Sequence, residues 1–305
     1  MTSPPPPGPP PAFRCAAAAR DRDDPQLGSA PQARRWLLIE HRGPWQIDAL
    51  AGSGISAAML RVIRGAVHTH QARPLLIRRP GRASTSPVRA WAVTYDDEAV
   101  TQWGTWQTDE DLYAAVEALA LPEAPADAST EPLLLACTHG VHDVCCALRG
   151  RPVAAALAAT WPDETWECSH VGGDRFAANL VVLPDGVYYG NLDPESSIRA
   201  VRAHLRGEVD LEHLRGMTRV PPPAQVAIAA VHERFGPFAA RDVLVVGIEL
   251  RSAGVWDVQL AVPSAHLTRI SATVHASRRD VATLTCRAGA ETSATQYAVH
   301  DLASG

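Results

Sequence analysis

The sequence predicts an α/β protein in which two similar units follow one another and an antiparallel β segment comes last. Strand and helix patterns alternate in the order strand, helix, strands and helix, and this order occurs twice between residues 31 and 220. After Pro221, short segments of alternating apolar and polar residues replace the helical periodicity. A chain of 305 residues with 46% hydrophobic and 20% charged residues can bury the cores of two or three domains.

Residues 1–30 are predicted to be a disordered, proline-rich N-terminus. The chain begins MTSPPPPGPPPA, which has neither the charged start nor the apolar core of a secretory signal. Residues 31–125 form the first unit, which contains no cysteine, so we expect a structural or interfacial role for it. Its strands and helices are expected at residues 36–40, 55–71, 73–79, 88–95, 101–107 and 109–119.

The Pro/Ala-rich stretch LPEAPADASTEP leads into the second unit, residues 126–220. Its elements are expected at residues 132–136, 144–160, 164–168, 178–184, 187–193 and 198–205. Gly150 and Pro152 predict a kink in the first helix, or two short helices in its place. One crossover helix followed by antiparallel strands is typical of a thioredoxin-like sheet, so the sequence predicts a tandem of two thioredoxin-like units.

Residues 221–305 are predicted to form a helix and an appended antiparallel sheet. The helix is expected at 224–235, and five strands at 243–250, 256–263, 269–276, 282–288 and 295–302. Cys286 falls in the fourth of these strands, where we expect a small buried apolar residue. Cys15 lies in the predicted disordered region, where we expect an exposed thiol.

Cysteine and histidine gather at two corners of the second unit. Cys137 comes directly after the predicted strand 132–136, and Cys146 follows after eight intervening residues, in the first turn of the helix. His170 and Asp174 follow the next strand and flank a Gly-Gly turn. Neighbouring strands would bring these four side chains to one end of the sheet. The spacing differs from the close Cys pairs of a zinc ribbon and from the Cys-x-x-Cys of thiol oxidoreductases.

The phrases CTHGVHDVCCALRGRP, WECSHVGGDRFAANLVVLPDG and YYGNLD closely resemble the sucrase/ferredoxin-like family. The resemblance is dense over residues 130–195 and implies a thioredoxin-like ferredoxin domain with a 2Fe-2S cluster. In that family two cysteines separated by eight residues and two histidines of a His-x-Gly-Gly-His motif hold the cluster. Carried over to this chain, the resemblance implies Cys137, Cys146 and His170 as ligands.

The fourth ligand position departs from the family pattern, because this chain has Asp174 there. A carboxylate is a harder ligand than imidazole and is unusual on a cluster iron. Three interpretations therefore remain: Asp174 is the fourth ligand, a nearby thiol replaces it, or no stable cluster forms. Cys168 is the better substitute thiol, since it shares a strand face with His170, whereas Cys145 points about 100° round the helix from Cys146. We expect the amides of Gly172 and Gly173 to hydrogen-bond the cluster.

The resemblance thus implies a one-electron carrier, acting with a redox partner protein. A hydrolase is not expected, because the sequence places no pair of carboxylates on the motif-bearing corner. Replacing thiolates by neutral imidazole raises a cluster's reduction potential, so a Cys/Cys/His/Asp site should lie between the all-cysteine and two-histidine cases. Two alternatives remain: a cofactor-free thioredoxin-fold interaction module that has lost the cluster, and a thiol-based redox protein.

Charge and composition exclude other classes. A net charge of -5 and a pI near 6.2 give no nucleic-acid footprint. The sequence contains no run of eighteen apolar residues, so it predicts no membrane span. We expect a cytoplasmic protein whose six cysteines are reduced or metal-bound.

Overall fold

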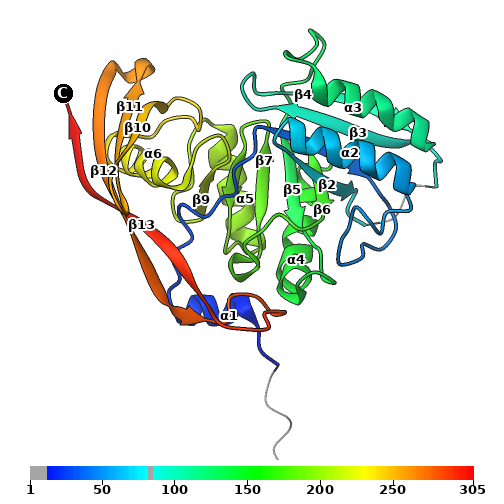
Figure 1. The fold of residues 1–305 in the computed structure, drawn as a ribbon, viewed down its shortest axis with the longest axis horizontal. Coiled ribbons are helices and arrows are strands. Elements are labelled where there is room, and N and C mark those ends of the chain that lie inside the picture. The colour runs from blue at the N-terminus through cyan, green and yellow to red at the C-terminus, as the bar shows by residue number, and fades with distance from the viewer. Residues whose placement is uncertain (1–11, 82–84) are drawn as a thin grey trace, which may run out of the picture.

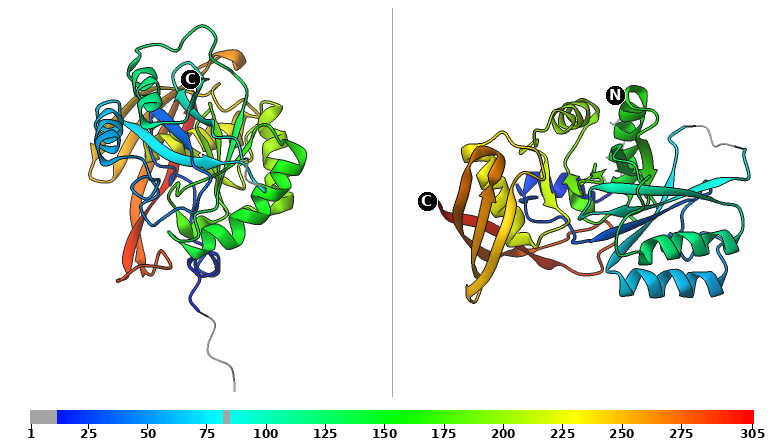
Figure 2. Two further views of the ribbon diagram at one scale, coloured as in Figure 1. Left: turned by 90° about the vertical axis from the view of Figure 1, so that its right-hand side faces the viewer. Right: turned by 90° about the horizontal axis from the view of Figure 1, so that it is seen from above.

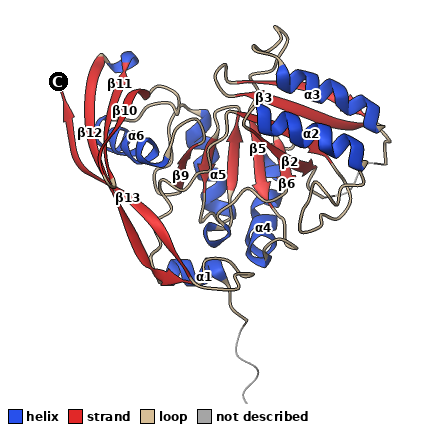
Figure 3. Ribbon diagram, in the orientation of Figure 1, coloured by secondary structure: helices blue, strands red, loops and turns tan. Residues whose placement is uncertain are grey.

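The computed structural model describes residues 12–81 and 85–305 and contains two sheets (Figure 1). A nine-stranded mixed sheet has the order β4-β3-β1-β2-β6-β5-β7-β8-β9, and a separate antiparallel sheet has the order β10-β11-β12-β13. Figure 3 shows how the helices flank these sheets. The strands of the large sheet are β1 (Arg35–Glu40), β2 (Ala72–Arg78), β3 (Arg89–Tyr95), β4 (Val100–Trp106), β5 (Leu133–Cys137), β6 (Thr165–Cys168), β7 (Leu180–Leu183), β8 (Val187–Tyr189) and β9 (Leu214–Met217).

The first eight strands form two groups with the same topology. In the first group, β1 is parallel to β2 and antiparallel to β3, which pairs antiparallel with β4. In the second, β5 is parallel to β6 and antiparallel to β7, which pairs antiparallel with β8. The crossover helices are α2 (Ala57–Thr69) and α4 (Val144–Thr160), and the later helices are α3 (Leu112–Ala120) and α5 (Pro194–Leu205). The repeated order predicted from the sequence is confirmed, in a mixed α/β protein.

A short antiparallel contact between β2 and β6 joins the two groups into one sheet. Strand alternation places Leu37 and Ile39 of β1 in the core beneath α2 and α3. Trp36 and Leu38 of the same strand enter a second core that also includes Leu135 of β5. This second core is shared by both groups, so neither group buries all of its apolar surface by itself.

The C-terminal sheet packs on α6 (Pro222–Phe235), which lies between this sheet and β9 (Figure 2). Its strands are β10 (Leu244–Ser252), β11 (Val255–Val262), β12 (Leu267–Ala282) and β13 (Thr292–Ser304). The predicted strand at 282–288 is wrong: β12 ends at Ala282, and Cys286 lies in the loop that connects β12 to β13. A turn at 286–287 and a bend at 289–290 interrupt the extended backbone there, and Ala288, Gly289 and Ala290 contribute little side-chain packing to a strand.

The N-terminal region also differs from its prediction. Residues 1–11 lie outside the described residues, but α1 (Cys15–Asp21) is helical where the sequence predicts disorder. Four alanines give this segment high helix propensity, and Ala16 and Ala19 are buried. Arg20 donates a hydrogen bond of 2.9 Å to the carbonyl of Ala177. Contact with the second group of strands therefore orders a helix too short to be stable alone.

Helix α4 is a single helix through Pro152, so of the two predicted alternatives the pair of short helices is wrong. Pro152 faces solvent, and Val153 and Leu157 are buried in the core below it. The burial of these side chains therefore compensates for the backbone hydrogen bond that Pro152 cannot donate. Among the helices that the structure describes, none has both the length and the apolar composition needed to cross a bilayer.

Candidate metal centre

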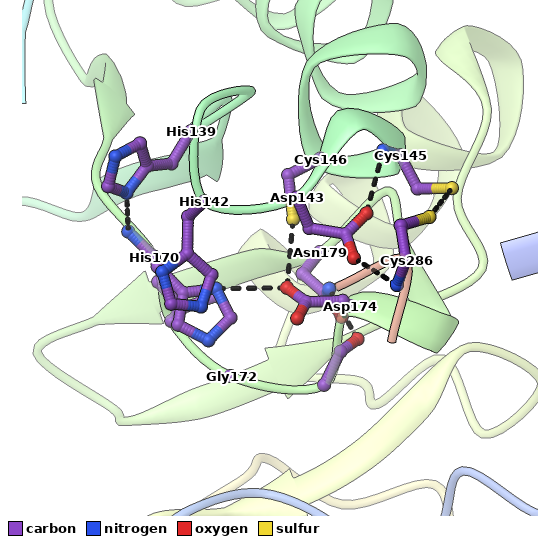
Figure 4. A network of polar contacts seen from close by, with 12 residues as sticks. His139, His142, Asp143, Cys145, Cys146, His170, Gly172, Asp174, Asn179 and Cys286 are labelled. Atoms are coloured by element: carbon purple, nitrogen blue, oxygen red, sulfur yellow. Dashed lines mark hydrogen bonds and ion pairs between the residues drawn. The ribbon is translucent and has the colours of Figure 1, made fainter. Parts of the chain in front are cut away.

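Three elements of the second group converge on one buried corner (Figure 4). Cys137 is the last residue of β5, and Cys146 lies in the first turn of α4. His170 follows β6, and Asp174 begins the 3-10 helix Asp174–Phe176. Because β5 and β6 are parallel neighbours, their carboxyl ends meet at the same edge of the sheet. The expectation that these four residues gather at one end of the sheet agrees with this arrangement.

The side-chain atoms of this corner are close enough to share a metal site. The ligand atoms of Cys137, Cys146 and His170 all lie within 4.8 Å of one another. Asp174 Oδ1 accepts a hydrogen bond of 3.2 Å from Cys146 Sγ and lies 3.0 Å from His170 Nδ1. Cys137 and Cys146 are each 1% exposed and Asp174 is 4% exposed, whereas His170 is partly accessible.

The four side chains at the corner differ in proton affinity, and only Cys137 and Asp174 are shifted toward the deprotonated form that binds a metal. A hydrogen bond from the Cys146 thiol, opposed by burial and helped by His170, lowers the pKa of Cys137 well below its usual value. The same pairing, together with burial, raises the pKa of Cys146. Burial acts to lower the pKa of His170, but the contacts with Asp174 and Cys137 outweigh it and raise that pKa to about 9. Burial acts to raise the pKa of Asp174, but the contact with His170 outweighs it and lowers that pKa. These contacts favour deprotonation of Cys137 and Asp174, whereas Cys146 and His170 would have to release a proton to bind a metal.

His142 is a member of the corner that the sequence predictions did not include as a ligand. Its ring stacks on that of His170 with centroids 3.7 Å apart. Its ligand atom lies within 4.8 Å of those of His170 and Asp174. The nearby His139 accepts a hydrogen bond of 3.2 Å from the His170 amide and contacts the Gln46 carbonyl at 2.7 Å, which fixes its tautomer with the proton on Nε2. The available signal in the sequence was a histidine four residues before Cys146, within the segment between the two cysteines.

The Gly-Gly turn is shaped by an arginine. Gly173 has φ of 77°, and a Cβ there would lie 2.3 Å from the guanidinium of Arg215. Arg215, 1% exposed, donates 2.9 Å and 2.8 Å hydrogen bonds to the Gly172 carbonyl and Asn179 Oδ1. Burial lowers the pKa of Arg215 to about 10, so it remains charged at neutral pH. Gly172 therefore contacts the arginine through its carbonyl and Gly173 through the close approach of its backbone, and the expected amide contacts to a cluster stay a prediction.

A cavity of about 310 Å³ opens beside His142 and His170. Residues 47–50, Arg64 of α2 and Leu75 of β2 line its other side. The first group of strands thus builds one wall of the approach to the corner, and the two imidazoles are the side chains of the corner that face the opening.

The remaining cysteines occupy different surroundings. Cys168 pairs in register with Cys137 and is fully buried, and burial raises its pKa. It belongs to none of the described groups of potential ligands. Cys145 points away from Cys146, as predicted from the helix, and meets Cys15 and Cys286. The expectations that Cys15 is an exposed thiol and that Cys286 lies buried on a strand are wrong.

A family model described as sucrase/ferredoxin-like matches residues 26–216, which is more than half of the chain and spans the whole corner. The chain belongs to the sucrase/ferredoxin-like family. No curated protein matches it, and no solved structure does. The matched region covers both groups of strands and ends before α6, so the C-terminal sheet lies outside the family model.

The donor set of this family member can be compared with what a cluster requires. Thiolates are the usual cluster ligands and imidazole is the known exception, and both donor types are present within reach of one another. In addition, the corner has two candidates for a fourth donor, Asp174 and His142. These buried groups could hold a metal ion, and the residues fit an iron-sulfur cluster in number and kind.

Proposed function

We propose that this chain is an electron-transfer protein that binds a 2Fe-2S cluster at the corner formed by Cys137, Cys146 and His170. The observation that carries the proposal is the convergence of these three ligand atoms within 4.8 Å at a buried sheet edge. Membership of the sucrase/ferredoxin-like family supports it. When bound, such a cluster takes up and releases one electron at a time.

The repeated topology supports the finer proposal that the chain contains tandem thioredoxin-like units at 31–125 and 126–220. Each group has a parallel pair of strands joined by a crossover helix, followed by antiparallel strands in the same order. The first unit would then act as scaffold, since it supplies a wall of the cavity and no cysteine.

The residues of the corner would have different roles. Cys137 and Cys146 would bind the cluster from the buried side, and His170 would bind it from the side that faces the cavity. Arg215 holds the backbone that positions His170 and Asp174, and its charge lies close to the negative donors. A cationic group near a cluster favours the reduced, more negative state, so it would raise the potential.

Asp174 and His142 are the two candidates for the fourth ligand. Asp174 is supported by its burial and by its 3.2 Å contact with the Cys146 thiol. His142 is supported by its stacking on His170, and its use would restore a donor set of two cysteines and two histidines. We propose Asp174, because its carboxylate lies deeper and already contacts both a thiol and an imidazole.

The alternative is a cofactor-free interaction module. One observation favours it: the carboxylate of Asp174 is satisfied by His170 and the Cys146 thiol without any metal. In either case we propose a cytoplasmic protein with a protein partner that docks near the cavity at His142 and His170.

The test is to purify the full chain without oxygen and to measure iron, acid-labile sulfide, absorption and the reduced-state paramagnetic resonance. We expect stoichiometric iron and sulfide in the wild type and loss or a changed resonance in Asp174→Ala. His142→Ala should keep the signal, and His68→Ala, on the exposed face of α2, is the matched control.

The opposite pattern, with loss in His142→Ala and an unchanged signal in Asp174→Ala, would move the fourth ligand to His142. A change in Cys168→Ser alone would move it to Cys168. A wild type that takes up no iron or sulfide even after reconstitution, while Asp174→His does, would establish the cofactor-free module.

A further inference from the structure

A second group of cysteines lies at the start of α4, on the side away from the corner (Figure 4). Cys15 comes from α1, Cys145 from the first turn of α4, and Cys286 from the loop between β12 and β13. Asp143, the N-cap of α4, completes the group. Sequence separations of up to 271 residues make this a product of the tertiary fold.

The four side chains have the spacing of a tetrahedral thiolate site. All their ligand atoms lie within 4.8 Å of one another, and Cys145 Sγ is 3.5 Å from Cys286 Sγ. Cys15 Sγ lies 3.5 Å and 3.6 Å from the Asp143 oxygens. Zinc-sulfur bonds of about 2.3 Å place the sulfurs of a tetrahedral site ~3.8 Å apart, so little movement separates the observed arrangement from a bound one.

The carboxylate of Asp143 is held in place by backbone amides. Its Oδ1 accepts a hydrogen bond of 2.8 Å from the amide of Cys145, and its Oδ2 accepts one of 2.8 Å from the amide of Cys286. Asp143 is 1% exposed. A carboxylate has about four lone-pair positions, so these two bonds leave capacity for a metal.

The surroundings also suit a negatively charged metal-thiolate group. Cys15 is fully buried, and burial together with the Asp143 charge raises its pKa, so without a cation the thiol stays protonated. Arg20 and Arg175 lie near enough to interact with the charges of Cys145 and Cys15. A cavity of about 340 Å³ lined by Arg14, Cys286 and Arg287 gives an ion access from solvent.

We propose that Cys15, Cys145, Cys286 and Asp143 bind a single thiophilic divalent cation of the zinc class, separately from the corner at Cys137. Three soft thiolates and one carboxylate from different segments match a closed structural site, in which every position is filled by protein. Such an ion fastens the N-terminal helix and the β12–β13 loop to the start of α4. Because Cys145 precedes Cys146, the ion also steadies the helix turn that carries a ligand of the first site.

The test measures zinc and iron in the same full-length preparations, purified anaerobically with reductant. We expect stoichiometric zinc in the wild type and its loss in Cys286→Ser, which changes a half-buried loop residue and is the variant least harmful to folding. Cys146→Ala is the matched control and should keep its zinc, whatever happens to iron. Exchange with Co²⁺ should give thiolate-to-cobalt absorption that weakens in Cys286→Ser and not in Cys146→Ala.

Zinc removal should also lower the thermal midpoint of the wild type and leave that of Cys286→Ser unchanged. The proposal is overturned if reduced wild type binds neither Zn²⁺ nor Co²⁺, or if zinc survives in both Cys286→Ser and Cys15→Ser. A Cys145–Cys286 disulfide found by mass spectrometry in protein that never binds zinc would likewise overturn it and assign the pair to thiol redox chemistry. Iron at the first corner is scored independently in every sample.

Discussion

At several buried positions of this protein, close contacts restrict which amino acid can be accommodated. Gly173 is an example, because a side chain there would collide with Arg215. Asp174 is another: its neighbours are a thiol, a histidine and the arginine-bound turn, so its carboxylate is both satisfied and available to a metal. Adding one proton or one methyl group at such a position is therefore expected to change the free energy of unfolding.

His232 of α6 predicts an acid-dependent loss of stability. Burial, reinforced by Arg219 and opposed by Asp242, lowers its pKa to about 4, and its Nε2 has no hydrogen-bond partner among the described residues. An unfolded histidine titrates near 6.5, so between about pH 6.5 and 4 the unfolded chain binds the extra proton and stability falls as pH falls. The loss should reach roughly 2–3 kcal/mol by pH 4.5.

Urea unfolding of wild type and His232→Gln at pH 7 and pH 4.5 measures this effect. The variant should lose less stability on acidification than the wild type, whereas His68→Gln, at an exposed position of α2, should behave as the wild type does. Equal pH dependence in wild type and His232→Gln would contradict the prediction.

Among the elements, α4 carries most of the site. Asp143 caps it, Cys145 and Cys146 project from its first turn to two different sites, and Gly150 allows it to approach β5. A Cβ at Gly150 would lie 1.9 Å from the carbonyl oxygen of Cys137. The distance between this helix and the strand therefore sets the separation of the two cysteines.

Gly150→Ala should destabilise the protein although alanine is the better helix former. Helix propensity alone favours the alanine by about 1 kcal/mol, but overpacking against the strand costs roughly 1–3 kcal/mol. Gly65→Ala in α2 is the matched control, because nothing lies within 4 Å of its Cβ position. Denaturant midpoints should fall for Gly150→Ala and rise for Gly65→Ala, and only the former should reduce iron content. A stabilised Gly150→Ala with unchanged iron would show that the helix can retreat without cost.

At the scale of the whole molecule, the two strand groups depend on a narrow junction. Only Ile77 with Cys168 and Arg78 with Glu167 are paired between β2 and β6. Arg78 Nε lies 2.7 Å from Glu167 Oε2, and both side chains are largely buried. Arg78 also lies over the ring of Trp45, which belongs to the loop beside the cavity. This ion pair thus links the junction to the approach of the metal centre.

Glu167→Gln should lower the free energy of unfolding by about 1–3 kcal/mol, since it leaves the arginine without its charged partner in a largely buried place. The control is Glu195→Gln, whose exposed pair with Arg199 should contribute under about 0.5 kcal/mol. Chemical denaturation checks both values. A loss no larger in Glu167→Gln than in Glu195→Gln would mean that the shared apolar core alone joins the groups.

Local patterns in the sequence determined the order of strands and helices from residue 35 to 205, because apolar periodicity and turn residues act over a few positions. They missed β9, at Leu214–Met217. They also predicted that Cys137, Cys146, His170 and Asp174 lie at one edge of the sheet, since each of these residues is next to the end or the start of a predicted element. Local patterns did not predict the structure where it depends on distant contacts. Helix α1 forms because it packs on another part of the chain, and α4 remains a single helix through Pro152 because its buried face packs in the core.

Only the tertiary structure decided which side chains from remote segments meet. His142 stacks on His170, and residues of the first strand group wall the cavity before them. Arg215 reaches the Gly-Gly turn, and Cys15, Cys145 and Cys286 come together from both ends of the chain. The physical reason is that strand pairing and core burial fix the relative positions of elements far apart in sequence, and no local pattern encodes those distances.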